Sequence, residues 1–139
     1  MKEPDVHSFN SAVMLESMAE SVLITDTKLK YPGPHIIYVN EAFEKMTGWN
    51  RDEIIGKSPR ILQGPDTDYT IFNDMQDKLE AGKVWSGKTL NYRKDGSEFY
   101  MQWSIVPVKD DHGEIIQYLA VQKDVTQFVY TEKKLQASM

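Results

Sequence analysis

The segment that decides the fold runs from Val84 to Thr126 and reads VWSGKTLNYRKDGSEFYMQWSIVPVKDDHGEIIQYLAVQKDVT. Its pattern predicts three long strands, over residues 84–93, 98–108 and 114–123. Asp95-Gly96 is a typical hairpin signal between the first two strands, and the polar run from Asp110 to Gly113 marks the second turn. Consecutive strands joined by such short turns predict an antiparallel sheet.

The middle strand of this segment has one face that is far more apolar than the other. Side chains alternate faces with period two, so the residues that share the apolar face are Phe99, Met101, Trp103 and Ile105. The matching faces of the two neighbouring strands carry Trp85, Gly87, Thr89, Asn91, Ile116, Tyr118, Ala120 and Gln122. We expect these faces to cover the core.

Asn91 and Gln122 are therefore expected to be amides set in an apolar wall. A buried amide without a partner costs roughly 1–3 kcal/mol. Either a ligand satisfies both amides, or each one bonds to the backbone or to a trapped water.

Shorter elements precede this segment. Two strands are expected over residues 21–26 and 35–39, and the prolines on either side of Gly33 require a loop between them. Asn40 fits the N-cap of a helix that ends at Gly48. The pattern thus predicts a hairpin followed by a helix.

Further helices complete the expected order. A short one is predicted over residues 51–55, and a longer one is expected to be capped by Asp66-Thr67-Asp68. Ser11 is expected to cap a helix before the first strand, and the chain becomes helical again after Thr126. Two strands, several short helices, three long strands and an exit helix predict an α+β fold with its helices on one face of the sheet.

Composition limits the function further. The chain has 139 residues, enough for one domain, with 40% hydrophobic and 27% charged residues. It has no cysteine, which excludes disulfides and thiolate chemistry, and its net charge of −5 argues against binding nucleic acid. No apolar run is long enough to insert into a membrane, and no signal peptide is evident, so we expect a cytoplasmic protein.

Several short strings, in this order and spacing, resemble the PAS domain family. They are Tyr38–Phe43, Thr47–Trp49, Gly56-Lys57, Arg60–Gly64, Asn91–Gly96 and Val121–Thr126. The most similar branch is the LOV (light, oxygen or voltage) type, which binds a flavin, FMN or FAD, between its helices and its sheet. The resemblance implies a five-stranded antiparallel sheet with short helices on one face and flanking N- and C-terminal helices.

The resemblance also implies three segments. Residues 1–16 would form an N-terminal arm and cap helix, 17–127 a PAS/LOV-like sensor domain, and 128–139 a C-terminal signalling helix that begins the linker to an effector. The resemblance therefore also implies a covalently linked effector, such as a histidine kinase or a cyclase.

On the helical side of the pocket, the LOV signature is altered. Pro59 stands where the family has its adduct-forming cysteine, so the flavin–cysteinyl photocycle is excluded. Arg60 and Gln63 match residues that hold the flavin phosphate and ribityl chain. Gln76 stands near the place of a second family arginine. Arg60 either binds phosphate or pairs at the surface with a nearby aspartate, Asp66 or Asp68.

On the sheet side, the match is also partial. Asn91 matches one of two asparagines that bind the flavin ring edge, whereas Met101 replaces the other. Gln122 matches the glutamine that senses flavin N5, and its amide would rotate when the flavin is reduced. The string Trp85-Ser86-Gly87 followed by Asn91 is similar to FAD-binding redox-sensing PAS domains, including nitrogen-fixation regulators.

The tryptophans leave two interpretations open. Trp103 either donates an electron to a flavin or fills the pocket, and Trp85 either stacks on a ligand or packs in the core. Ile105 completes the apolar wall of the predicted flavin site.

We therefore expect a sensory module that binds a flavin and relays its redox or light-driven reduction state through the C-terminal helix, without a cysteinyl adduct. A homodimer through the terminal helices is expected. The alternative is a flavin-free PAS domain used for dimerisation, signal relay or another small ligand. No enzyme is predicted, because no nucleophile, base and oxyanion site assemble, and the scattered histidines predict no metal site.

Overall fold

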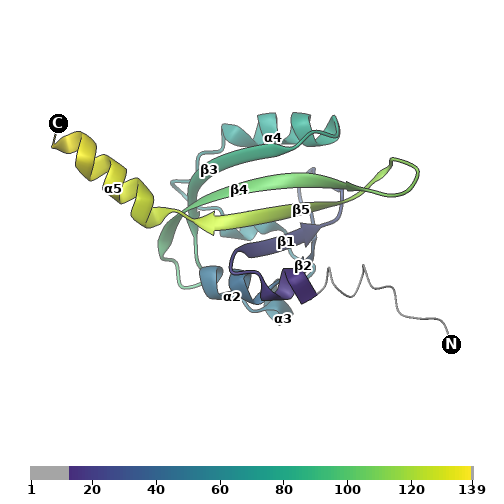
Figure 1. Cartoon of the computed structure of the whole chain (residues 1–139), viewed down its shortest axis with the longest axis horizontal. Helices are drawn as coiled ribbons and strands as arrows, with labels where there is room; N and C mark the ends of the chain where they lie inside the picture. Colours follow the sequence, from purple (N-terminus) through teal and green to yellow (C-terminus); the bar gives the residue numbers. More distant parts are fainter. Residues whose placement is uncertain (1–12, 139) are drawn as a thin grey trace.

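A computed structural model describes residues 13–138. Its centre is one antiparallel sheet of five strands in the order β2-β1-β5-β4-β3 (Figure 1). The strands are β1 (Ser21–Thr25), β2 (Ile36–Val39), β3 (Trp85–Tyr92), β4 (Glu98–Lys109) and β5 (Ile115–Asp124). The three long strands predicted from the sequence thus lie side by side in the sheet, as β5, β4 and the edge strand β3, and the α+β class is confirmed.

Short helices connect β2 to β3. They are α2 (Glu41–Thr47), α3 (Arg51–Ile54), the 3₁₀ helix η1 (Pro59–Leu62) and α4 (Ile71–Glu80). Residues 13–17 are also helical, and the chain ends in α5 (Thr126–Ala137). Each connecting helix contributes one fully buried side chain to a core that it shares with the sheet: Phe43, Ile54, Leu62 and Leu79.

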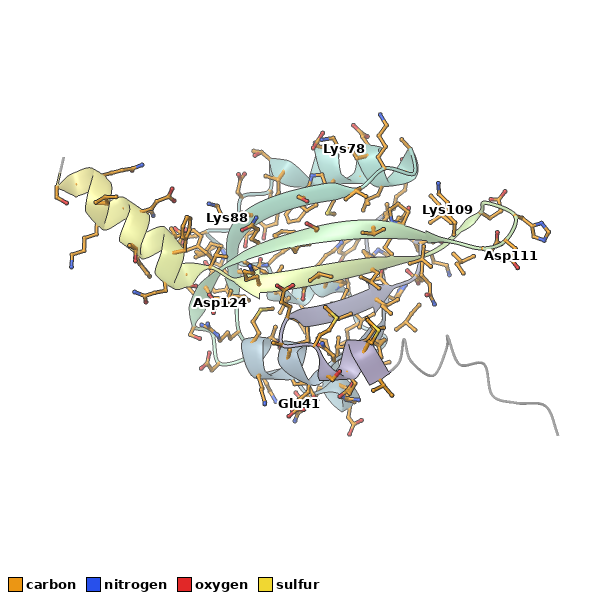
Figure 2. The ribbon with its side chains drawn as sticks, viewed as in Figure 1. Glu41, Lys78, Lys88, Lys109, Asp111 and Asp124 are labelled. Atoms are coloured by element: carbon orange, nitrogen blue, oxygen red, sulfur yellow. The ribbon has the colours of Figure 1, made fainter. Side chains whose placement is uncertain are left out.

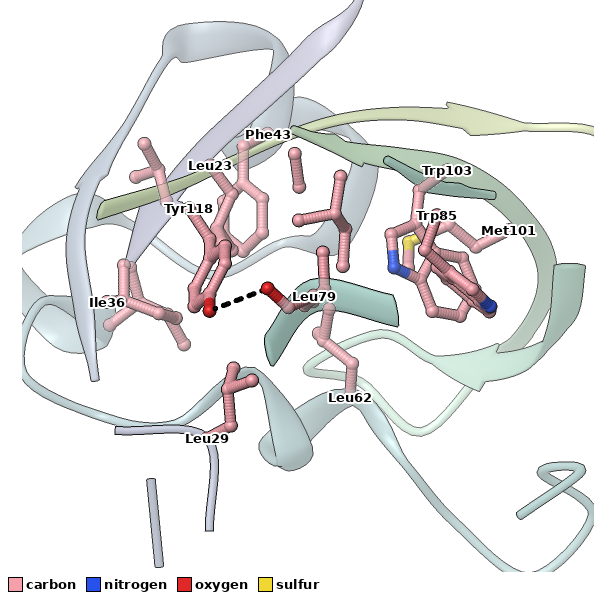
Figure 3. Close-up of a cluster of buried hydrophobic side chains, with 14 of the residues drawn as sticks. Leu23, Leu29, Ile36, Phe43, Leu62, Leu79, Trp85, Met101, Trp103 and Tyr118 are labelled. Carbon is pink, nitrogen blue, oxygen red and sulfur yellow. Dashed lines mark hydrogen bonds between the residues drawn. The ribbon is translucent and has the colours of Figure 1, made fainter. Parts of the chain in front are cut away.

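The apolar face predicted for β4 does cover the core. Phe99, Met101, Trp103 and Ile105 are all buried. Figure 3 shows Met101 and Trp103 among the other core side chains. Burial of one such side chain contributes roughly 1.5–3 kcal/mol, so this face is a main source of stability. Ile116 is an exception, because it is 49% exposed. The register between β4 and β5 shifts beyond Val108, near the end of the hairpin, so the alternation no longer carries Ile116 to the core.

Asn40 caps α2 as predicted and also holds two other segments. Its Oδ1 accepts hydrogen bonds from the backbone N–H of Phe43 (3.1 Å) and of Val22 in β1 (2.9 Å). Its Nδ2 donates to the carbonyl oxygens of Leu15 (2.8 Å) and Glu20 (3.0 Å). All the polar atoms of this buried amide are therefore used to join β1, α2 and the N-terminal helical turn.

The predicted cap of α4 is wrong. The helix begins at Ile71, and its N-cap residue Thr70 makes no side-chain capping bond. Asp68 instead closes a local turn by accepting from Thr70 N (3.0 Å), and Thr67 Oγ1 donates across to Leu90 O in β3 (2.8 Å). Local turn bonds compete with helix capping for the same side chains. The other predicted cap, Ser11, lies outside the described residues.

The exit helix leaves the domain instead of lying against it (Figure 1). At the start of this helix, the N-cap residue Val125 and the first-turn residue Val129 are buried. Phe128 and Leu135 are 61% and 65% exposed. The first turn of α5 therefore packs on the sheet and the remainder extends away.

Candidate functional site

A cavity of about 200 Å³ lies between the core face of the sheet and the segments η1 and α4. Eight of the nine predicted site residues line it: Pro59, Arg60, Gln63, Asn91, Met101, Trp103, Ile105 and Gln122. They come from η1 and the residue after it, and from all three long strands. The fold thus brings together residues that are up to 63 positions apart in sequence, from Pro59 to Gln122.

Trp85 is the predicted residue that does not line the cavity. It packs edge-on against Trp103, with ring centroids 5.2 Å apart and ring planes at 64° (Figure 3). Its ring also lies over Gly87, where any Cβ atom would collide with it. The packing interpretation of Trp85 therefore holds, and Gly87 is required because it leaves room for this indole.

Trp103 stands between Trp85 and the cavity. Trp103 is 6% exposed. On the helical side, the centroid of the Phe72 ring from α4 lies 6.5 Å from the centroid of the Trp103 ring. Trp103 fills part of the pocket and still lines what remains. Both interpretations of this side chain are compatible with its position.

The two amides of the apolar wall are buried, each 3% exposed, and each has a protein partner. Gln122 Oε1 accepts from Ser21 Oγ (2.9 Å), while its Nε2 has no hydrogen-bond partner among the described residues. The amide of Asn91 can adopt two orientations. In the one that places Nδ2 next to the main chain, Nδ2 donates to Leu62 O (3.3 Å) and Leu90 O (3.2 Å). The opposite orientation leaves only a 3.8 Å contact from Nδ2 to the sulfur of Met101. Each amide keeps one polar end without a described partner.

Arg60 does not pair with Asp66 or Asp68, so that interpretation is wrong. Its guanidinium donates to two carbonyl oxygens of the β1–β2 loop, from Nε to Gly33 (2.8 Å) and from Nη2 to Leu29 (3.1 Å). The loop contributes Leu29 and Pro34 to the cavity lining. Sequence reasoning had no signal for this wall, because the loop was recognised only by its prolines.

Tyr118 was placed on the core face by the strand alternation but was given no role. It lines the cavity, and its hydroxyl donates to Leu79 O (3.3 Å; dashed in Figure 3). Burial, and then the negative charge of Glu80, raises the pKa of Tyr118. The phenol therefore stays neutral at physiological pH and keeps a proton to donate.

A network of short hydrogen bonds joins the sheet to α5. Asp124 Oδ1 accepts from Thr126 N (2.9 Å) and Thr126 Oγ1 (2.6 Å), and Thr126 Oγ1 accepts from Tyr100 N (2.9 Å). The other Asp124 oxygen pairs with Arg93 Nη2 at 2.7 Å. Asp124 lies at the base of α5 (Figure 2). Asp124 and Thr126 thus tie the helix to the core, and sequence reasoning missed the role of Arg93.

Arg93 connects this network to the rest of the domain. Its Nε donates to Met46 O at the end of α2 (3.0 Å), and its guanidinium lies 4.7 Å from the centroid of the Phe99 ring. Arg93 is two residues beyond Asn91, and Asp124 is two residues beyond Gln122. The ion pair therefore directly follows the two cavity amides along their strands. We call Arg93, Tyr100, Asp124 and Thr126 the exit junction.

The described residues 13–138 contain neither a candidate metal site nor a candidate membrane-spanning helix. Within residues 13–138, no group of three or more His, Asp or Glu side chains is placed to hold a metal ion. No helix in that range is long and apolar enough to cross a bilayer. His35 pairs with Asp26, with Nδ1 and Oδ2 2.7 Å apart, and so holds the ends of the β1–β2 loop together.

Comparison with known proteins identifies the family. The PAS domain family matches residues 19–127, and the chain belongs to this family. It is 41% identical over 122 residues to the blue-light-activated histidine kinase of Brucella anthropi, covering 88% of this chain and 24% of that protein. It is 30% identical over 126 residues to the nitrogen fixation regulatory protein of Klebsiella oxytoca, covering 91% and 24%. The chain thus spans about a quarter of the length of these relatives.

A solved structure places the chain nearer to one branch. It is similar to a light-oxygen-voltage domain studied with a flavin analogue, with a TM-score of 0.76 and 32% identity over 94% of this chain and 93% of that one. The resemblance to PAS domains of LOV type is thereby confirmed. The five-stranded sheet with its short helices is the fold of that branch.

Proposed function

We propose that this chain is a sensory module that binds a flavin, FMN or FAD, in the cavity and relays the state of the flavin through α5. The observation that carries the proposal is the pair of buried amides, Asn91 and Gln122, which reach one cavity from the strands on either side of β4. A flavin ring edge offers carbonyl and imide groups that complement such amides. The names of the relatives, which refer to blue light and to nitrogen-fixation regulation, support a sensory role.

The residues of the cavity fit a flavin in kind. Apolar side chains such as Leu62 and Ile105 suit the flat ring, and the free ends of Asn91 and Gln122 suit its polar edge. The volume of about 200 Å³ is below the roughly 300–1,000 Å³ of most ligand pockets. Binding therefore requires a side chain such as Phe72 or Trp103 to turn aside.

A bound flavin supplies one- and two-electron redox chemistry. The chain has no cysteine, so no thiol of this chain forms a covalent adduct, and the response is a change of redox state driven by light or by a reductant. Trp103 and Tyr118 are oxidisable side chains on the cavity wall. Tyr118 also holds a proton on its hydroxyl, directed to Leu79 O.

Gln122 is the residue that we propose to carry the signal out of the cavity. Its Oε1 accepts from Ser21 of β1, so turning the amide toward a ligand exchanges this bond for a new one. Ser21 and Gln122 face each other in the β1–β5 register, and Asp124 follows two residues later. A change at Gln122 therefore reaches the first turn of α5 through the exit junction.

The test is Gln122→Leu. We expect the variant to keep its flavin and to lose the change in amide exchange at residues 125–129 that reduction causes in the unmodified chain. Gln117→Leu is the matched control, because Gln117 lies on β5 with the opposite strand parity and does not line the cavity. If reduction leaves amide exchange of α5 unchanged in all three proteins, the relay through Gln122 is wrong.

The second candidate is a flavin-free PAS module for dimerisation, relay or another small ligand. The small cavity favours it, because Trp85, Trp103 and Phe72 together occupy much of the space under β3 and β4. The exposed apolar residues of α5, Phe128, Tyr130 and Leu135, offer a surface for a second copy in either case. A yellow purified protein would indicate the flavin-binding module and a colourless one the flavin-free module. The molar mass of the protein in solution tests whether it forms a dimer.

We place any catalysis in an effector outside this segment. The blue-light-activated relative is a histidine kinase of which this chain matches only 24%. Such a kinase, or a cyclase, covalently linked after α5 would receive the signal.

A further inference from the structure

Four aromatic rings pack in succession between the surface and the core. The ring of Tyr69 packs on that of Phe72, with centroids 6.0 Å apart, and Phe72 lies 6.5 Å from Trp103. Trp103 in turn packs on Trp85 at 5.2 Å. Phe72 and Trp103 line the cavity, whereas Tyr69 is 53% exposed and Trp85 only 3%. The succession therefore joins the cavity to solvent at its Tyr69 end and stops in the core at its Trp85 end.

The two oxidisable aromatic side chains on the cavity wall have no way to discharge an oxidised state. Trp103 and Tyr118 are 6% and 5% exposed. The hydroxyl of Tyr118 donates to Leu79 O (3.3 Å), and a backbone carbonyl cannot keep the proton that an oxidised phenol releases. A positive charge left in this apolar wall is costly and out of reach of a reductant in solution. An electron given up here would therefore return from the flavin unless another group replaces it.

Tyr69 has the access to water that the wall residues lack. Its exposed phenol can release a proton directly to solvent when it is oxidised. Its hydroxyl donates to Gly64 O (3.2 Å), and its carbonyl oxygen accepts from Phe72 N (3.4 Å) at the start of α4. Neither bond involves the Phe72 ring, so Tyr69 keeps its position when that ring turns to admit a ligand.

We infer that Tyr69 is the site at which electrons enter the domain to replace the one that Trp103 gives to a light-excited flavin. Trp103 loses one electron to the flavin, and Tyr69 then gives one electron to Trp103 and its phenolic proton to water. A small reductant such as ascorbate returns one hydrogen atom to the Tyr69 oxygen. Both side chains are thereby restored, and the electron stays on the flavin.

The chemistry of the rings sets the direction of this transfer. A phenol that loses its proton to water is easier to oxidise than an indole, so the oxidised state moves from Trp103 to Tyr69. The Phe72 ring is far harder to oxidise than either and serves only as the packed medium between them. This inference rests on the proposed function, because it concerns how the flavin of the same site is reduced.

The test compares three variants of the full chain loaded with FMN. Each protein is illuminated without oxygen in the presence of ascorbate while the flavin absorption is followed. Tyr69→Phe is expected to slow reduction several-fold and to leave FMN affinity unchanged, because Tyr69 does not line the cavity. Tyr31→Phe is the matched control, since Tyr31 is 82% exposed but packs on Arg60 instead of an aromatic ring. Trp85→Phe is the second control, because Trp85 packs on Trp103 but is buried.

A second measurement detects the oxidised side chain itself. Samples frozen during illumination without ascorbate are studied by electron paramagnetic resonance. We expect the signal of a tyrosyl radical in the unmodified chain, in Tyr31→Phe and in Trp85→Phe, and its loss in Tyr69→Phe.

The outcomes separate this inference from the proposed function. A chain that binds FMN but is reduced equally fast with and without Tyr69, and keeps its radical signal in Tyr69→Phe, overturns the inference and leaves the proposed function standing. Slow reduction in Trp85→Phe or Tyr31→Phe, with a normal rate in Tyr69→Phe, overturns it as well. Failure to bind FMN overturns the proposed function, and this inference with it.

Discussion

The cavity wall and the exit junction lie close together on the same strands, yet they are held in opposite ways. In the cavity wall, Asn91 and Gln122 each use only part of their hydrogen-bonding capacity. In the exit junction, Asp124 is bound through both carboxylate oxygens, at 2.6–2.9 Å, by Thr126 and Arg93. The first region is free to exchange partners and the second is not.

This difference teaches how a small domain can separate sensing from transmission. A ligand can recruit the unused amide ends of the cavity wall, and turning Gln122 exchanges only its single bond from Ser21. The exit junction then moves as one unit, because charge-assisted bonds fix Asp124 to β3 and to α5 together. Only one residue separates each amide from its member of the Arg93–Asp124 pair, so little strand is available to absorb a displacement.

The largest loss of folding stability is expected at a core residue that lies next to both the cavity wall and the exit junction. Phe99 is fully buried and lies beneath Arg93. We expect Phe99→Ala to lower the free energy of unfolding by roughly 3–5 kcal/mol, as measured by denaturant titration, because it leaves a cavity in the core. Val106→Ala, on the same strand but 43% exposed, should cost less than about 1 kcal/mol. Similar losses in both variants would show that the two regions do not depend on this core position.

A second pair of variants acts on the cavity wall alone. Trp103→Leu and Trp85→Leu remove the same atoms from adjacent rings, and each should cost roughly 2 kcal/mol. Only Trp103 lines the cavity, so only its variant should enlarge the site and bind FMN more tightly. Titration with FMN checks this expectation. Weaker binding by Trp103→Leu would mean that Trp103 contacts the ligand instead of filling its place, and tighter binding by Trp85→Leu would mean that Trp85 also limits the size of the site.

A third variant acts on the exit junction. Arg93→Gln removes the ion pair to Asp124. Because the side chains of Arg93 and Asp124 are only 29% and 33% exposed, we expect the free energy of unfolding to fall by roughly 1–2 kcal/mol. Amide exchange at residues 125–129 should become faster while flavin affinity stays unchanged. Lys45→Gln breaks an exposed ion pair with Glu41 and should change neither quantity. Protection of α5 that survives Arg93→Gln would contradict the central place given to this ion pair.

The smallest effect concerns the attachment of the N-terminal helical turn. Hydrogen bonds, first from Arg51 and then from Tyr38, lower the pKa of Glu16 below its usual range. A lowered folded-state pKa gives stability that is present above the unfolded value of about 4.3 and is lost as the pH falls through the folded value. Because Glu16 is 42% exposed, the change should be small and confined to faster amide exchange near residues 15–17 below about pH 4. Glu16→Gln should remove this pH step, and its persistence in the variant would assign it to another group.

Most of the fold could be predicted from local signals. Asp95-Gly96, the alternation from Phe99 to Ile105 and the cap residue Asn40 each encode their structure within a few residues, and each prediction is confirmed. Ile116 failed because a register shift near the hairpin end interrupts the alternation that places side chains in the core. The cap at Asp66–Asp68 failed because those side chains form turn and cross-strand bonds that a local pattern does not reveal.

The candidate site was predictable in membership but not in detail. Strand alternation brought Asn91, Met101, Trp103 and Gln122 together without knowledge of the tertiary structure. The commitment of Arg60 to carbonyl oxygens 27 and 31 positions away depends on how the loop folds back, which no spacing encodes. The role of Arg93 was missed for the same reason, because its partner Asp124 is 31 positions distant.

Sensing and relay both depend on the binding of a flavin in the cavity through its two amides. The most direct test is the absorption spectrum of the purified chain, before and after incubation with FMN, with heat release and identification of any chromophore. We expect the banded blue absorption of a protein-bound flavin, and its loss in an Asn91→Leu, Gln122→Leu double variant that still folds. A chain that stays colourless after incubation with FMN and FAD would contradict the account and favour the flavin-free module.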